Sequence, residues 1–216
     1  MIAIAQGDWN LARTLNERGL AVSPLDTRLL GTRLVIEFET GNTRDSIGYL
    51  EQAITAYRLV PDGARYDHAS TALMIPVAAR ISGDTGLIHI AEGAAATVFE
   101  SDSPTPLVSR FARLGLGMIA VLNGDAESAA EQYAELDGTR SSFLKISSDR
   151  VLGLLAQTMG EIDTATVHFE EALQFCHNAG YRPALAYSNY DYTGALLEGN
   201  GPGDRNRATE LLNESV

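Results

Sequence analysis

Apolar residues recur at helical spacing along most of this chain. In the segment 161–179, for example, Ile162, Ala165, Phe169 and Leu173 are three or four residues apart, which places their side chains on one face of an α-helix. The pattern therefore predicts an all-α fold. The predicted helices lie near residues 8–19, 26–40, 43–59, 66–82, 84–99, 107–123, 125–137, 145–159, 161–179, 181–198 and 204–215.

A short turn that begins with glycine separates many of these helices. It occurs at Gly7, Gly41, Gly83, Gly124 and Gly160, each followed by Asp, Asn or Glu, with a degenerate version at Gly199. Successive glycines are 34, 42, 41, 36 and 39 residues apart, within the range of helix-pair repeats. Glycine takes the left-handed conformation that ends a helix, and the residue after it can cap the next helix. The sequence predicts an α-solenoid of antiparallel helix pairs, one array over residues 1–216 with about six repeats.

Two segments also carry strand-like signals, and one predicted helix contains a proline. Residues 35–40 alternate partly, and Asn123-Gly124 is a frequent hairpin dipeptide. Helical spacing continues through both places, so helix is the preferred interpretation. Pro76 removes an amide from the segment 66–82 and is expected to bend or break that helix.

Two units share a pattern of small, apolar and aromatic residues. It consists of Leu116, Gly117, Ala120, Gly124, Ala129 and Tyr133, and then of Leu152, Gly153, Ala156, Gly160, Ala165, Phe169 and Ala172. In this pattern both units resemble the tetratricopeptide repeat. This resemblance implies a right-handed superhelix in which the first helix of each pair lines a concave face.

A narrower resemblance covers the last third of the chain. It rests on residues 149–156, 168–173, 179–183, 191–192 and 201–205. These stretches resemble the tetratricopeptide regions of bacterial LuxR-type transcriptional regulators and of adenylate or guanylate cyclases. In those families the repeats are regulatory and follow a P-loop ATPase module. The resemblance implies a non-catalytic scaffold for a protein or peptide, which includes other domains of the same polypeptide, and favours the LuxR-type regulator over the cyclase.

Composition narrows the range of partners and compartments. With 16 Lys+Arg against 28 Asp+Glu, the formal charge of −12 opposes direct contact with nucleic acid. Cys176 is the single cysteine, so an intrachain disulfide is impossible and a cytoplasmic location is expected. No apolar run approaches the roughly 20 residues that span a bilayer.

Signals for chemistry are weak. Gly115, Gly117 and Ala120 fit a dinucleotide-binding pattern, but helical rather than strand spacing precedes them, and two of them are repeat positions. A helical nucleotide-binding enzyme is therefore the lesser alternative. The four histidines are scattered and are expected at the surface or at helix edges, so no cofactor, metal or catalytic residue is predicted. Cys176 is interpreted as a packed thiol.

The repeat register predicts which residues face the concave groove. They are Arg80, Met118, Arg150, Gln157 and Tyr190. Two arginines in a groove suggest a ligand with a carboxylate, whereas pairing of these arginines with local Asp or Glu is an equal alternative.

The two ends of the chain are expected to be incomplete repeats. Too few residues precede Gly7 for a full helix, and Leu211, Leu212 and Val216 are expected to have nothing to cover them. Frayed ends or a homodimer through an exposed end would follow. Within the best repeats, Phe169→Ala is expected to be costly and His168→Ala cheap.

Overall fold

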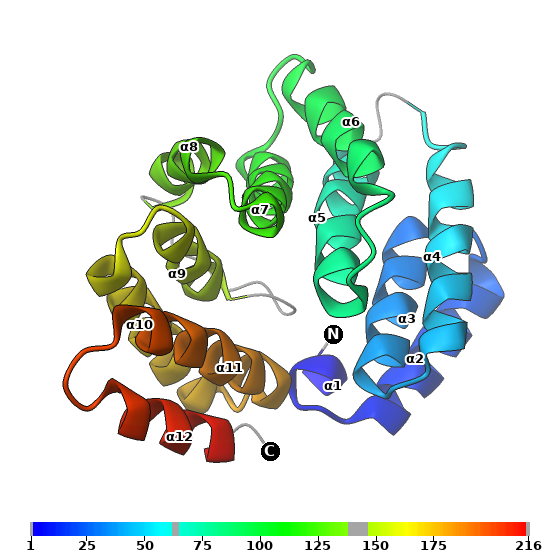
Figure 1. Cartoon of the computed structure of the whole chain (residues 1–216). Coiled ribbons are helices and arrows are strands. Elements are labelled where there is room, and N and C mark those ends of the chain that lie inside the picture. The colour runs from blue at the N-terminus through cyan, green and yellow to red at the C-terminus, as the bar shows by residue number, and fades with distance from the viewer. Residues whose placement is uncertain (1, 62–64, 138–146, 215–216) are drawn as a thin grey trace. The chain divides into compact units, whose positions relative to one another are not determined.

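The chain is all-helical. A computed structural model describes residues 2–61, 65–137 and 147–214, and these residues hold helices and turns without a strand. The helices, labelled in Figure 1, are α1 (Ile2–Ala5), α2 (Trp9–Val22), α3 (Thr27–Glu39), α4 (Thr43–Tyr57), α5 (Arg65–Ser82), α6 (Ile88–Phe99), α7 (Pro106–Asn123), α8 (Ala126–Asp137), α9 (Ser148–Thr158), α10 (Ile162–Ala179), α11 (Arg182–Gly199) and α12 (Asp204–Glu214). The prediction of an all-α fold is confirmed, as is helix rather than strand at residues 35–39.

The glycine turns end helices as the sequence predicts. The backbone angle φ is positive at Gly7, Gly41, Gly83, Gly124 and Gly160, with values between 63° and 81°. After three of them the same bond recurs: the amides of Asp8, Asn42 and Glu161 donate to the carbonyls of Ala3, Glu37 and Ala156. This six-residue bond is the Schellman motif, which satisfies carbonyls left open at a helix end. One repeated local geometry therefore ends α1, α3 and α9.

The prediction that the residue after each glycine caps the next helix holds only in part. Asp125 accepts hydrogen bonds from the amides of Glu127 and Ser128 and so caps α8. The side chains of Asn42 and Glu161 make no such bond. At the degenerate turn, α11 continues through Gly199 and the left-handed residue is Asn200, with φ 49°.

One predicted helix boundary and one predicted helix break need correction. The helix expected from residue 84 begins at Ile88, because the Asp84 carboxylate accepts a bond from the Gly86 amide and holds a turn there. Helix α5 runs unbroken through Pro76, so the expected break does not occur. Leu73, Ile75 and Ala79 are buried on both sides of Pro76, and this burial holds the helix together.

The chain divides into two compact units, and each is described by itself. The unit of residues 9–122 contains α2 to α7, with α3 against α4 and α5 against α6. Its core includes Ala69 and Ala72 of α5, Ala94 and Val98 of α6, and Ala112 of α7. Small residues let these helices come close: a Cβ added at Gly115 of α7 would lie 2.3 Å from the Ala72 carbonyl oxygen.

A buried ion-pair network joins α2 and α3 in this unit. The Glu37 side chain is 1% exposed. Its carboxylate accepts hydrogen bonds from Arg13 at 3.1 and 3.0 Å, from Arg33 at 2.5 Å and from Asn42 at 2.7 Å. Each carboxylate oxygen therefore has more than one donor, as a buried charge requires.

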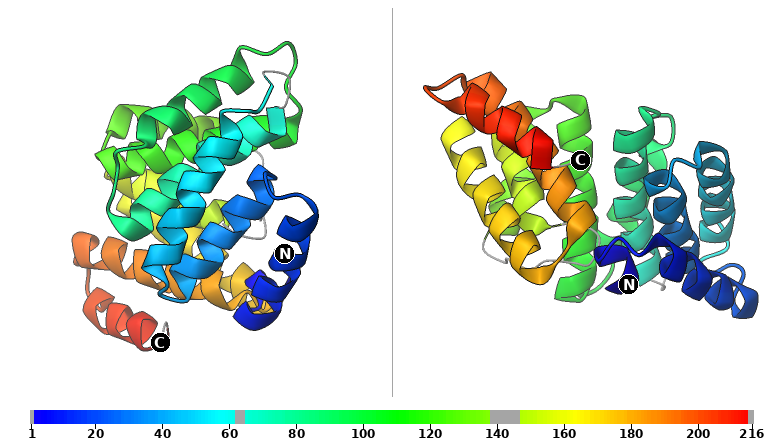
Figure 2. Two further views of the ribbon diagram at one scale, coloured as in Figure 1. Left: turned by 90° about the vertical axis from the view of Figure 1, so that its right-hand side faces the viewer. Right: turned by 90° about the horizontal axis from the view of Figure 1, so that it is seen from below.

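The other compact unit comprises residues 1–8 and 123–216. Its later helices contact their neighbours in order, α8 with α9, α9 with α10, α10 with α11 and α11 with α12. Helices α11 and α12 lie side by side in Figures 1 and 2. Phe169 of α10 is fully buried, fits against Gly153 of α9 and stacks on Tyr192 of α11 at 5.6 Å between ring centroids.

The first residues also belong to this unit, because α1 packs against α11. Ala3, Ile4 and Ala5 are each about 5% exposed, and Gly7 lies near Pro183.

Leu211 of α12 is fully buried, so the expectation that it has nothing to cover it is wrong. Leu212 is 41% exposed, and Val216 lies outside the described residues. The single array of six repeats and the dimer through an exposed end stay predictions.

Candidate functional site

Two side-chain bonds link α9 to α11. The guanidinium of Arg150 donates to the Asp191 carboxylate at 2.6 Å, and the Gln157 amide donates to the Glu198 carboxylate at 2.8 Å. The bonds are seven residues apart on both helices, which is close to two helical turns. Two helices linked at this interval run alongside each other in the same direction, so α10 returns between them.

Arg150 is held by its own chain. Its side chain is 11% exposed, that of Asp191 is 1% exposed, and the guanidinium also lies 4.8 Å from the ring centre of Tyr187. A buried carboxylate and an aromatic face thus take up the charge of Arg150. Of the two predicted alternatives for this arginine, the structure shows the local pair with Asp191.

The exposed side of α11 forms a surface that we call the α11 face. It consists of Tyr190, Gly194 and Leu197, with Gln157 and Glu198 beside them. Tyr190 is 64% exposed and Leu197 is 54% exposed. The space above Gly194 is open, since the atom nearest to a Cβ built there is Nε2 of Gln157 at 3.8 Å. The face therefore offers two apolar side chains on either side of a gap, next to an amide and a carboxylate.

Arg80 and Met118 belong to the compact unit of residues 9–122. Arg80 is partly exposed in the last turn of α5. Met118 is 3% exposed, so its prediction as a groove residue is wrong. The physical reason is that α7 is buried on most of its circumference, with Leu114, Gly117, Ile119 and Ala120 also in the core.

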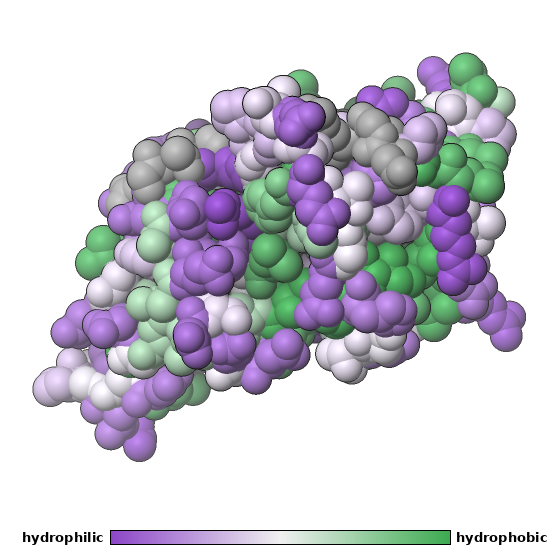
Figure 3. Space-filling model, turned by 90° about the horizontal axis from the view of Figure 1, so that it is seen from above, coloured by the Kyte–Doolittle hydropathy of each residue, from purple (hydrophilic) through white to green (hydrophobic). Residues whose placement is uncertain are grey.

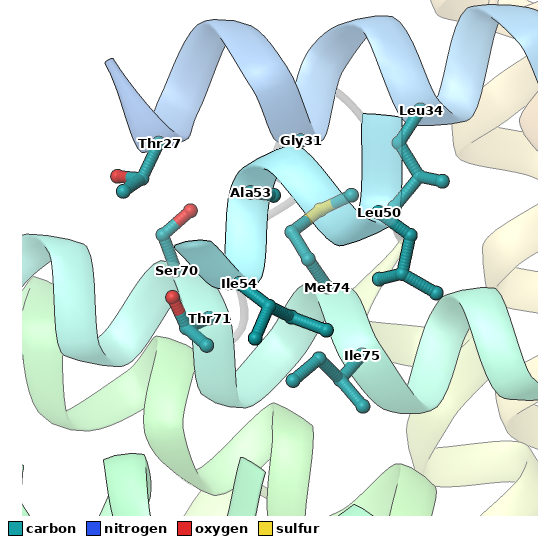
Figure 4. Close-up of a pocket in the computed structure, with 10 residues that line it drawn as sticks. All are labelled: Thr27, Gly31, Leu34, Leu50, Ala53, Ile54, Ser70, Thr71, Met74 and Ile75. Atoms are coloured by element: carbon teal, nitrogen blue, oxygen red, sulfur yellow. The ribbon is translucent and has the colours of Figure 1, made fainter. Parts of the chain in front are cut away.

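A small cavity lies between α3, α4 and α5 (Figure 4). Its volume is about 20 Å³, and Gly31, Leu34, Ile54, Met74 and Ile75 are among the residues that line it. This space suits about one water molecule, whereas small-molecule sites usually have roughly 300 Å³ or more. The cavity is therefore too small for a small-molecule ligand.

The glycine pattern at residues 115–120 lies within α7, which begins nine residues earlier at Pro106. Dinucleotide-binding glycines stand in the turn between a strand and a helix start, where amides face the phosphate. Gly115 instead meets the backbone of α5 at Ala72. Gly115 therefore lies at a contact between helices, and Gly117 and Ala120 are buried in α7.

Two of the four histidines are not where the sequence predicts them. His68 and His168 are 5% and 3% exposed, and each contacts a tyrosine hydroxyl, that of Tyr57 at 3.0 Å and that of Tyr133 at 2.8 Å. The expectation of surface histidines is wrong for both, because a hydroxyl from another helix satisfies the ring nitrogen. Sequence spacing along one helix does not reveal such a partner.

Cys176 is buried, as predicted. Burial raises the pKa of its thiol to about 11, although the nearby Arg150 lowers it somewhat. The thiol is therefore almost entirely protonated at neutral pH, which makes it a poor nucleophile. The exposed His177 beside it does not change this.

Hydrophilic residues cover much of the face drawn in Figure 3, and hydrophobic residues are exposed at several places among them. Across the described ranges, the structure contains no helix that is both long and apolar enough to cross a membrane.

Comparison of the chain with protein-family models, with curated proteins and with solved structures found no match.

Proposed function

We propose that this chain is a non-catalytic scaffold that binds a protein or peptide through the α11 face. In this proposal its helix pairs form a tetratricopeptide-like solenoid with a right-handed superhelix, and the array regulates a larger cytoplasmic protein. The observation that carries the proposal is the pair of bonds from Arg150 to Asp191 and from Gln157 to Glu198, seven residues apart on both helices.

This repeated pairing supports a solenoid because it relates alternate helices by a regular step. In a stack of helix pairs, every second helix points the same way and presents equivalent positions to its neighbours. The Schellman turns at Gly7, Gly41 and Gly160 repeat in the same manner. Gly153 against Phe169 matches the small and aromatic positions of the tetratricopeptide repeat.

The chemistry of the α11 face favours an extended peptide segment with an apolar side chain and a cationic group. Gly194 leaves room for the apolar side chain between Tyr190 and Leu197. Glu198 and Gln157 offer hydrogen-bond acceptors at its edge. The formal charge of −12 attracts a cationic segment over longer distances. Arg150 no longer supports the hypothesis of a ligand with a carboxylate, because its guanidinium is bound to Asp191.

A selection from a random peptide library displayed on phage tests this function with the full chain as bait. Selected peptides should be enriched in Lys or Arg next to an apolar residue. Tyr190→Ala, and Gly194→Leu to fill the gap, should each weaken peptide binding about ten-fold or more. Val167→Ala, at a 56% exposed apolar position on α10, is the matched control and should bind as the wild type does.

Failure to select any peptide, or equal affinity in all three variants, would reject the α11 face as a binding surface.

For the parent protein, we propose a LuxR-type transcriptional regulator, with a cyclase as the second candidate. The coding sequence that adjoins this segment distinguishes them: a helix-turn-helix supports the regulator and a cyclase domain supports the alternative. Calorimetry with NAD or ATP should give no saturable heat, and saturable binding would favour the enzyme alternative.

A further inference from the structure

Three side chains that commonly bind metal ions converge where α9 begins beside α10. Asp149 lies in the first turn of α9, and His168 and Glu171 are three residues apart on α10. One ligand atom from each, Oδ1, Nδ1 and Oε2, lies within 4.8 Å of the other two. The spacing of three along a helix places His168 and Glu171 on one face, and Asp149 supplies a ligand from the neighbouring helix.

His168 is fixed in a suitable orientation. Its side chain is 4% exposed, and its Nε2 lies 2.8 Å from the Tyr133 hydroxyl. When Nε2–H donates to this hydroxyl, the other nitrogen, Nδ1, presents a lone pair toward the two carboxylates. A metal-binding histidine usually makes such a bond through its second nitrogen, which fixes the tautomer and the ring plane.

The distances from Nδ1 of His168 to the two carboxylate oxygens are too long for direct hydrogen bonds and suit three ligands of one ion. Nδ1 lies 4.0 Å from the Asp149 oxygen and 3.8 Å from the Glu171 oxygen, beyond hydrogen-bonding range. Around a tetrahedral Zn²⁺ with bonds of about 2.1 Å, neighbouring ligand atoms are about 3.4 Å apart. Small rotations of these side chains would close the difference. All three atoms are shielded from solvent. Bulk water therefore does not compete with an ion for them.

We propose that Asp149, His168 and Glu171 form a binding site for a divalent transition metal ion, for which Zn²⁺ is the best match. An imidazole nitrogen with two carboxylates suits zinc, whereas magnesium and calcium prefer oxygen ligands alone. The two carboxylates match the charge of a divalent ion. Glu171, whose side chain is 38% exposed, lies on the side from which the ion enters. The bound ion ties α9 to α10. This site does not depend on the scaffold function, and it revises the expectation that the chain has no metal site.

Calorimetric titration of the full chain in metal-free buffer, with ZnCl₂ as the probe, tests the proposal. One Zn²⁺ should bind per chain, and saturating Zn²⁺ should raise the melting temperature by roughly 5 °C. Excess Mg²⁺ should not displace it. Glu171→Gln keeps the size of a partly exposed side chain, so this variant should fold and yet bind Zn²⁺ at least about ten-fold more weakly.

Two further variants complete the design. Tyr133→Phe removes the hydroxyl that orients His168 and should also weaken Zn²⁺ binding about ten-fold. His177→Gln, at an exposed histidine on the same helix, is the control and should keep the wild-type affinity. The absence of saturable Zn²⁺ binding would overturn the proposal, as would an affinity of Glu171→Gln equal to that of the wild type. In either case Asp149, His168 and Glu171 would interact only with other groups of the protein.

Discussion

Glu37 is a charged residue whose interactions make the stability of the protein depend on pH. Burial by itself would raise the pKa of its carboxyl group. Hydrogen bonds from Arg13, Asn42 and Arg33 outweigh burial and lower the pKa from 4.5 to about 2. Because the folded-state pKa is depressed, the stabilisation is fully present above about pH 4.5 and is lost as the pH falls toward 2.

The first prediction follows from this shift. The free energy of unfolding should fall by about 3 kcal/mol between pH 5 and pH 2 on account of Glu37. Glu37→Gln should be destabilised at pH 7 and should lose much less on acidification, as measured by urea denaturation across this pH range. Glu51→Gln, at an exposed carboxylate on α4, is the control. Parallel pH profiles for wild type and Glu37→Gln would contradict the role of Glu37.

The second residue-scale prediction compares two glycines that both lie inside helices. A Cβ at Gly115 would lie 2.3 Å from a backbone oxygen of α5, whereas no atom lies within 4 Å of a Cβ built at Gly93. Gly115→Ala should cost roughly 2 to 3 kcal/mol because α7 must move away from α5. Gly93→Ala should stabilise the protein by about 0.5 to 1 kcal/mol because alanine favours the helix. Urea denaturation of both variants measures this contrast, and a change of the same sign in both would refute it.

At the scale of helices, much of the fold could be predicted from the sequence because the signals are local. The spacing of Ile162, Ala165 and Phe169 and the glycine at position 160 define α10 and the turn before it without reference to other parts of the chain. The late start of α6 depends on the side chain of Asp84, and propensity alone does not reveal it. Pro76 stays inside α5 because tertiary burial outweighs the loss of one backbone hydrogen bond.

The residues of the candidate binding surface could be predicted only in part, because their surroundings depend on other helices. A helical register tells which side of a helix a residue occupies, and it placed Tyr190 on an exposed side. It does not tell how many other helices surround the element, so it failed at Met118. Nor does it identify partners from other helices, such as Asp191 for Arg150 or Tyr133 for His168. The spacing of His168 and Glu171, on which the proposed metal site rests, is missed when only pairs of histidines are considered.

The element-scale prediction concerns four side chains of α10. Phe169 and His168 are buried, whereas Phe175 is 39% exposed and His177 is exposed. Phe169→Ala should cost roughly 3 to 5 kcal/mol, and Phe175→Ala clearly less. His168→Ala should cost about 1 to 3 kcal/mol because it leaves the Tyr133 hydroxyl without this bond, in contrast to the small effect expected from sequence. His177→Ala should change little. Chemical denaturation gives all four values, and equal costs for His168→Ala and His177→Ala would disprove the buried role of His168.

At the scale of the whole molecule, the first residues belong to the compact unit that residues 123–216 form. The contact between α1 and α11 places Ile4 in that core at 5% exposure, while Ile2 is 69% exposed. Substitutions at these two isoleucines therefore report on the contact.

Ile4→Ala should cost about 2 kcal/mol or more and should speed amide hydrogen exchange in α11. Ile2→Ala, the matched control in the same helical turn, should leave exchange in α11 unchanged. Hydrogen exchange followed by mass spectrometry resolves the two helices. Faster exchange confined to α1 and α2 in Ile4→Ala would show that α1 does not support α11.

The position of α1 also has a consequence for synthesis on the ribosome. Ala3, Ile4 and Ala5 leave the exit tunnel long before the helix that covers them, Arg182–Gly199, is made. At about 5 to 20 residues per second, these side chains wait for roughly nine seconds or more while α2 to α7 can already fold. Nascent chains stalled before residue 182 should therefore leave α1 open to proteases or to a chaperone, and synthesis through α11 should close it.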